Sequence, residues 1–203
     1  MFDEKKYLKP AENIDVSSLS WSSDLPARFK ELAVKIEPGF HPDNIENGEI
    51  ADTRYALREI DYQGSKLLLA GRDDRLITPQ AESRAFNFYI IKDGSYVNLT
   101  IEVDETGEEE DPIIAERTVV RYDAERKLPP GIGRVFVGQA DKFLQELVNN
   151  SGRPVIERVS RSPGHGGVEL TGEDWDRMFI DELQKRGYQR ISDETFEKKF
   201  IPE

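Results

Sequence analysis

The sequence predicts an α+β fold in which a mixed, mostly antiparallel sheet is flanked by helices. Two observations lead to this expectation. Residues 84–122 alternate apolar and polar side chains around an Asp93-Gly94 turn, which is typical of antiparallel strands. Residues 134–150 instead repeat apolar side chains at the i, i+4, i+7 spacing of a helix with one buried face. We therefore expect an antiparallel meander followed by a tight loop, a helix, a strand, a second helix and a hairpin.

Residues 1–50 are predicted to form an N-terminal extension with one amphipathic helix, and residues 51–203 the α+β domain. Residues 1–25 are polar and lack apolar periodicity, so we expect a loosely packed lead-in whose Trp21 docks on the body of the domain. Pro26 suits a first helical turn, and apolar side chains follow at helical spacing as far as Ile36.

The first half of the domain is predicted to be sheet. Residues 53–71 have strand character on both sides of Gln63-Gly64-Ser65, which favours a hairpin, with a helix over residues 51–60 as the alternative. The meander ends in a third strand from Ile113 to Tyr122. Before that strand, residues 104–111 carry six acids, which we interpret as a solvated hairpin tip because the spacing is not that of a calcium loop.

The second half is predicted to contain two helices. A helix begins after Gly133, and a short strand follows over residues 153–160. Thr171 and Asp174 form a capping box for the second helix, which Gly187 would end. Two short strands over residues 188–192 and 195–201 complete the chain.

Composition excludes several classes of protein. The 203 residues contain no cysteine and two histidines far apart, which argues against disulfides, thiol catalysis and a histidine-rich metal site. The formal net charge of −12 argues against nucleic-acid binding. No apolar stretch is long enough to span a membrane, and the N-terminus lacks the pattern of a signal peptide. We therefore expect a cytoplasmic protein.

The bases nevertheless gather in one part of the chain. Five of them lie within eighteen residues between Arg117 and Arg134, and three more arginines follow in the next predicted strand. Either this is a local cationic patch on an acidic protein, or the bases only pair with nearby acids such as Glu116 and Glu157.

Residues 127–136, KLPPGIGRVF, place two prolines and two glycines directly before a helix. One interpretation is a tight connection from strand to helix. The other is a phosphate site, because glycines let backbone N–H groups converge on an anion and a helix N-terminus adds about half a positive charge.

Residues 84–200 resemble the GNAT superfamily of acyl-CoA-dependent N-acyltransferases, as a divergent member. In that family the fourth strand leads into a loop of the form Arg/Gln-x-x-Gly-x-Gly/Ala and then into a helix whose N-terminus receives the pyrophosphate of CoA. Here Gly131-Ile132-Gly133 supplies Gly-x-Gly, and Gly187-Tyr188 looks like the family's Gly-aromatic pair. The resemblance implies a GNAT-like fold and acetyl-CoA or another acyl-CoA as cofactor.

The resemblance also implies which residues bind that cofactor. The strand backbone would pair with the pantetheine arm, and the loop, with its bases, would hold the pyrophosphate. These residues are Val119, Val120, Arg121, Arg126, Lys127, Leu128, Gly131, Ile132, Gly133 and Arg134. Three departures from the family are visible: Leu128 stands where Arg or Gln is usual, Pro129 and Pro130 remove backbone donors, and Leu183 lies near the position of the usual tyrosine acid.

The implied reaction is attack of an amine on a thioester, for which Glu116 is the candidate catalytic base, acting through a water. Its alternative interpretation is a strand-surface glutamate paired with Arg117 or Arg158. The acceptor would be a small-molecule or protein amine, since an acidic protein suits a cationic partner. The alternative function is a non-catalytic acidic binding or interaction protein on a GNAT-like or other α+β fold. The sequence does not predict the oligomeric state.

Overall fold

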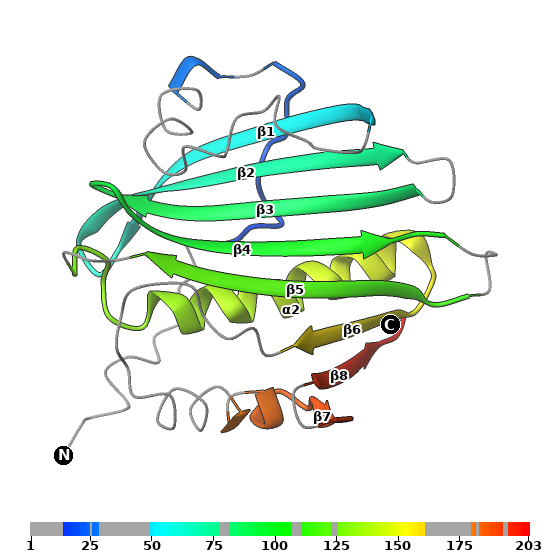
Figure 1. Ribbon diagram of the computed structural model, residues 1–203. Coiled ribbons are helices and arrows are strands. Elements are labelled where there is room, and N and C mark those ends of the chain that lie inside the picture. The colour runs from blue at the N-terminus through cyan, green and yellow to red at the C-terminus, as the bar shows by residue number, and fades with distance from the viewer. Residues whose placement is uncertain are drawn as a thin grey trace.

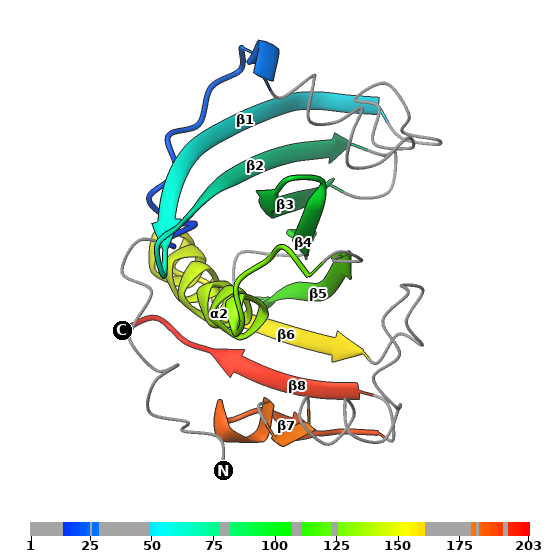
Figure 2. The ribbon, with the colours of Figure 1, turned by 90° about the vertical axis from the view of Figure 1, so that its left-hand side faces the viewer.

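The structure is a computed structural model dominated by one curved and twisted sheet (Figures 1 and 2). It describes residues 14–24, 26–28, 49–77, 82–106, 111–122, 126–160, 180–181, 183–192 and 195–203. The strands are β1 (Glu49–Tyr62), β2 (Ser65–Ile77), β3 (Glu82–Lys92), β4 (Ser95–Asp104), β5 (Ile113–Tyr122), β6 (Val155–Ser160), β7 (Gln189–Arg190) and β8 (Thr195–Phe200). Their order in the sheet is β1-β2-β3-β4-β5-β6-β8-β7. All neighbours are antiparallel except β5 and β6, which are parallel.

The predicted hairpins are confirmed. Gln63 and Gly64 have φ of 54° and 75°, and Asp93 and Gly94 have φ of 48° and 82°. Two successive positive φ values are the requirement of the tight turn whose twist matches that of antiparallel strands. The alternative of a helix over residues 51–60 is wrong, because this segment pairs with β2 as part of β1.

The predicted fold class, an α+β fold with a GNAT-like sheet flanked by helices, is wrong. The described part of the chain is sheet-dominated, with eight strands in a single sheet. The reason is that β2 also pairs with β3, so the first hairpin extends the meander into five consecutive strands of 10 to 14 residues. Periodicity predicts each strand separately, but it does not show that the hairpin and the meander pair with each other to form one sheet.

One long helix, α2 (Ile132–Ser151), lies against one face of the sheet, which we call the α2 face (Figure 2). The helix predicted over residues 134–150 is confirmed, and α2 begins two residues earlier and ends one residue later. The side chains that point to the sheet recur every fourth residue and are fully buried: Ile132, Phe136, Ala140, Leu144 and Val148. Beside this stripe, the Phe143 ring lies 4.7 Å from the ring of Phe86 and 5.3 Å from that of Phe88. This packing fixes α2 along the sheet.

The segment of residues 14–22 packs against the α2 face. Ile14, Val16 and Leu19 are buried, and the Trp21 ring meets Phe88 edge-on at 6.1 Å. Ser22 forms a β-bridge with Tyr55 of β1. The docking of Trp21 is thus confirmed, whereas the expectation of a loosely packed lead-in is wrong for these residues. The domain boundary at residue 50 stays a prediction.

Several other predictions fall wholly or largely outside the described residues. They concern the helix over residues 26–36, the capping box at Thr171 and Asp174, the tip of the acidic loop, and both histidines.

Gly71 of β2 leaves the space in which Trp21 sits. A Cβ at this position would lie 2.9 Å from Trp21 Cη2 and 3.1 Å from Leu19 Cδ1. We expect Gly71→Val to displace the Trp21 segment and to lower the free energy of unfolding by about 1–3 kcal/mol, as overpacked cores do. Urea unfolding followed by tryptophan fluorescence measures the loss. An unchanged midpoint would show that residues 14–22 are not packed as described.

Candidate functional site

The parallel pair β5 and β6 is only partly joined. β5 pairs with β6 only from Ile113 to Glu116, opposite Val155 to Arg158. On its other side it pairs with β4 as far as Tyr122. Successive residues of a strand direct their backbone groups alternately to the two neighbours. On the β6 side, residues 118–122 therefore present backbone N–H and C=O groups that no described strand pairs. We call this segment the open edge of β5.

The loop after β5 leads to an unusual helix start. Gly131 is the N-cap of α2 with φ 80°, and no side chain caps this end. The Ile132 N–H bonds to the Pro129 carbonyl at 3.4 Å, but no backbone bond joins the Gly133 N–H to another described residue. A Cβ at Gly133 would meet no atom within 4 Å. No acid lies in the first turn, so the positive end of the helix dipole is not offset there.

The predicted loop residues have different environments. Leu128 and Ile132 are buried in the core, so only their backbone groups can contact a ligand. Arg126 is exposed, with φ 52°. The Lys127 ammonium donates to the Asp93 carbonyl at 3.1 Å, which ties the loop to the turn between β3 and β4. The backbone of Arg134 lies in the first turn of α2, and its side chain is outside the described part.

The predicted strand residues, Val119, Val120 and Arg121, all lie on the open edge of β5. Their backbone positions are described and their side chains are not. The predicted contacts to a pantetheine arm involve the backbone alone. The structure therefore places all three residues on a strand edge that no described strand pairs on the β6 side, and the predicted contact with the pantetheine arm requires such an edge.

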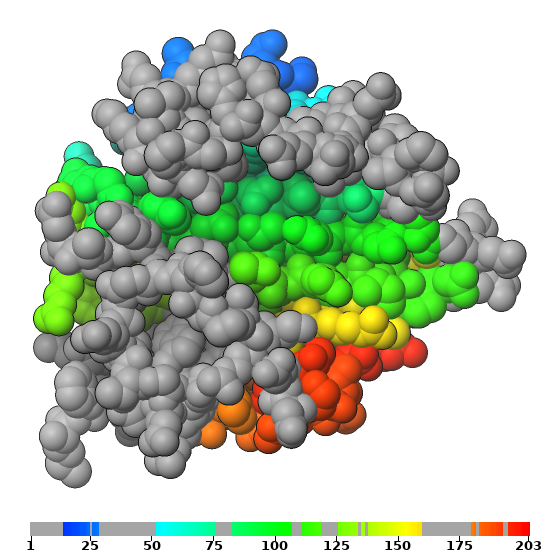
Figure 3. All heavy atoms as spheres, viewed as in Figure 1, coloured from blue at the N-terminus to red at the C-terminus, as the bar shows by residue number. Residues whose placement is uncertain are grey.

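Glu116 is exposed on the face opposite α2, at the last paired position before the open edge. This is the face seen in Figure 1, and Figure 3 shows β4, β5 and β6 side by side at its surface. Pairing with Arg117 is excluded, because adjacent strand residues point to opposite faces. Arg158 stands opposite Glu116, but its Nε lies 3.3 Å from Glu197 Oε2 instead.

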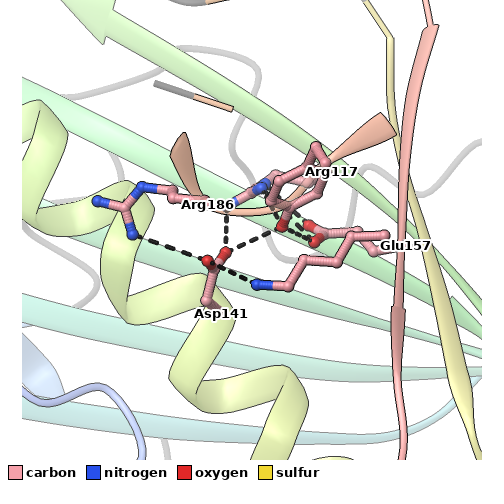
Figure 4. Close-up of polar contacts among 6 residues, drawn as sticks. Arg117, Asp141, Glu157 and Arg186 are labelled. Carbon is pink, nitrogen blue, oxygen red and sulfur yellow. Dashed lines mark hydrogen bonds and ion pairs between the residues drawn. The ribbon is translucent and has the colours of Figure 1, made fainter. Parts of the chain in front are cut away.

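A buried group of charges, the Arg117 cluster, lies on the α2 face just behind Glu116 (Figure 4). Its members are Arg117, Asp141, Glu157, Arg186, Tyr188 and Lys198. The Arg117 and Glu157 side chains are 1% and 0% exposed. Arg117 Nε lies 2.8 Å from Glu157 Oε1, and its Nη2 donates to the Tyr188 hydroxyl at 2.7 Å. The hydroxyl in turn donates to Glu157 Oε2.

Asp141 of α2 closes the Arg117 cluster on its outer side. Its Oδ1 lies 2.9 Å from the Tyr188 hydroxyl oxygen, whose one proton is donated to Glu157, and its Oδ2 lies 3.3 Å from the Lys198 ammonium and 3.7 Å from Arg186 Nη1. The cluster therefore joins β5, β6, β8, α2 and the segment before β7. The sequence named Glu157 only as one of the acids with which the nearby bases could pair, and it does pair with Arg117. The available signal was its position between Val155 and Val159, which alternation assigns to the buried face.

Burial and charge shift the pKa values in the Arg117 cluster. Burial raises the pKa of Glu157, and Arg117 and Tyr188 only partly offset this effect. Burial also raises the pKa of Tyr188, so its hydroxyl stays protonated and can donate to a carboxylate. Burial opposes the charge of Arg117, but Glu157, Tyr188 and Asp141 outweigh it and raise the pKa of the guanidinium. The Arg117 cluster therefore joins these elements through buried ion pairs and hydrogen bonds.

Comparisons with models of protein families, with curated proteins and with solved structures found no match to this chain. Within the described ranges, no group of three or more His, Asp or Glu side chains is placed to hold a metal ion. No helix in the same ranges is long and apolar enough to cross a membrane. Function is therefore inferred from the open edge of β5, the start of α2 and Glu116.

Proposed function

We propose that the chain is an acyl-CoA-dependent N-acyltransferase that binds its acyl-CoA along the open edge of β5. The single observation that supports this most is the parallel pairing of β5 and β6 over four positions only. A strand edge without a neighbour binds extended chains through backbone hydrogen bonds. The pantetheine arm of CoA is such a chain, with two amide groups, and residues 118–122 offer the matching donors and acceptors.

The start of α2 supports the same placement. β5 runs towards this helix start, and Gly133 leaves an N–H and open space there. A helix N-terminus without an acid in its first turn favours a phosphate. We infer that the pyrophosphate of CoA lies against Gly133 while the pantetheine arm follows β5 towards Glu116.

The proposed chemistry is amine attack on the thioester at the inner end of the open edge. A C–N bond forms, the C–S bond breaks, and CoA leaves as its thiolate, which takes a proton from solvent water, while the amine proton returns to solvent through Glu116. Glu116 takes the amine proton, directly or through a water, because it is exposed at the last paired position. The acceptor is a small-molecule or protein amine rather than a nucleic acid, consistent with the net charge of −12. The proposal places the reaction in the cytoplasm.

A pair of variants at Gly133 tests where the cofactor binds. We expect Gly133→Asp to weaken acetyl-CoA binding by about tenfold or more, since repulsion of about 1.4 kcal/mol suffices. Gly133→Ala should weaken binding less than Gly133→Asp does, because its methyl group meets no protein atom and adds no charge. Both residues are compatible with a first helical turn, so neither change should unfold α2. Calorimetric titration with acetyl-CoA gives the affinities, and equal binding by both variants would contradict the placement.

A second function, non-catalytic binding, is favoured by one observation. Leu183, near the position where the family has its tyrosine acid, is 1% exposed and packs with Val159, Tyr188 and Phe196. It supplies no proton to a leaving thiolate. If the protein binds acetyl-CoA but transfers no acetyl group to a panel of amines, it is a binding protein. If it does not bind at about 1 mM, where a ligand of that Kd half-saturates the site, the acyltransferase proposal is wrong.

A further inference from the structure

A second site candidate lies at the other end of the sheet. A cavity of about 350 Å³ is lined by six charged side chains, which we call the charged pocket: Asp52, Arg54, Asp73, Arg75, Arg84 and Glu105. These residues come from the beginning of β1, the end of β2, the beginning of β3 and the residue after β4. The volume is near the lower end of the range for small-molecule sites.

The charged pocket is built around a buried carboxylate. The Asp73 side chain is 2% exposed and lies between the guanidinium groups of Arg54 and Arg84. Arg54 Nε donates to Oδ2 at 2.9 Å, and Arg84 donates from Nε to Oδ1 and from Nη2 to Oδ2, both at 2.6 Å. Two cations thus share one anion, and both guanidinium groups are held in place by it.

Aromatic rings fix the same two guanidinium groups from a second direction. The Arg54 guanidinium lies 6.0 Å from the Trp21 ring, and that of Arg84 lies 4.6 Å from the Phe86 ring. Neither Arg54 Nη1 nor Arg84 Nη1 bonds to a described residue. Because these donors are held before a ligand arrives, little side-chain entropy is lost when a carboxylate binds to them.

The other wall carries acids. Asp52 is exposed, Glu105 is half-buried, and neither carboxylate has a hydrogen bond to a described residue. Together with Asp73, which bonds to it directly, these two acids raise the pKa of Arg84, so they lie within electrostatic reach of it. With three arginines and three acids, the formal charge of the lining is zero. A ligand with only negative charge would meet two carboxylates as well as the arginines, in a protein of net charge −12.

We infer that the charged pocket binds a small zwitterion, a molecule of the size of a free α-amino acid with one carboxylate and one ammonium group. The carboxylate bonds to the outward Nη1 groups of Arg54 and Arg84, and the ammonium group lies against Asp52 and Glu105. The pocket is separate from the proposed acyl-CoA site. Arg84 stands opposite Val103 near the end of β4, whereas the open edge of β5 lies beside the beginning of β4. The inference is therefore independent of the proposed function.

The test is calorimetric titration of the full chain with each of the twenty common L-amino acids, and with inorganic phosphate. At least one amino acid should bind with a Kd of about 10 mM or tighter, and its N-acetyl and carboxamide derivatives should each bind at least about tenfold more weakly, because each derivative loses one charged contact worth about 1.4 kcal/mol. Absence of binding by all twenty, or equal binding by either derivative, would overturn the inference. Phosphate binding as tight as that of the best amino acid would also overturn it, since it would indicate a plain anion site.

A double variant locates the binding. Asp52→Asn with Glu105→Gln should weaken binding of that amino acid by about tenfold, because the ammonium group loses both of its partners. Neither substitution removes a partner of buried Asp73, whose partners are Arg54 and Arg84, so the variant should fold. The matched control removes two exposed acids elsewhere, Glu102→Gln with Asp181→Asn, and should leave the affinity unchanged. Equal affinities of the two double variants would place the ligand outside the charged pocket.

Discussion

Arg117→Met is expected to lower the free energy of unfolding by about 3–5 kcal/mol, the cost of leaving a buried charge without its partner. The substitution removes the cation that lies 2.8 Å from Glu157, whose side chain is fully buried. Urea unfolding followed by tryptophan fluorescence and by circular dichroism measures the loss. A change below about 1 kcal/mol, the value of an exposed ion pair, would contradict the description of the Arg117 cluster.

The loss should depend on pH. Burial already raises the pKa of Glu157, and without Arg117 its folded-state pKa rises further above the unfolded value. Between these two pKa values the folded state binds more protons than the unfolded state, so stability falls as pH rises. We therefore expect a larger loss at about pH 8 than at about pH 5. The double variant Arg117→Met with Glu157→Leu removes both charges and should recover most of the stability at either pH.

Glu116→Gln is expected to lower kcat for acetyl transfer by about 100-fold, the usual contribution of a positioned general base. The side chain is exposed, so stability should change little, and the affinity for acetyl-CoA should stay that of the wild type. Steady-state assays with a panel of amines, together with calorimetric titration, separate the two effects.

The matched control is Glu102→Gln, which removes the same charge from the neighbouring position on β4. It should keep the wild-type kcat, because Glu102 lies one strand farther from the open edge of β5. Equal losses in the two variants would indicate a general effect of surface charge and would exclude Glu116 as the base.

Local pattern was sufficient to predict most of the elements. The two-residue turns at Gln63-Gly64 and Asp93-Gly94 fix the registers of their hairpins, and the stripe from Ile132 to Val148 fixes α2. Each of these signals lies within about twenty residues of sequence. The predicted proportion of sheet to helix was wrong because the hairpin and the meander form one sheet. They are joined by the pairing of β2 with β3, which has no local signal in the sequence.

The sites depend on contacts between residues that are far apart in the sequence. Residues 118–122 of β5 have no described partner on the β6 side because the pairing with β6 ends at Glu116, opposite Arg158. The motif at residues 127–136 indicated the helix start, and Gly133 does leave space there, but burial of Leu128 and Ile132 could not be read from the motif. The charged pocket was missed because Arg54, Asp73 and Arg84 come from three strands and form no motif.

Amide hydrogen exchange of the wild-type protein, measured by NMR with and without acetyl-CoA, tests the central claim most directly. If the pantetheine arm pairs with the open edge of β5, amides of residues 118–122 that point away from β4 should gain protection, and the Gly133 amide signal should shift. Amides of β8, which is paired with β6 along its whole length, should not change. Saturating acetyl-CoA without added protection in residues 118–122 would contradict the proposal that β5 holds the cofactor.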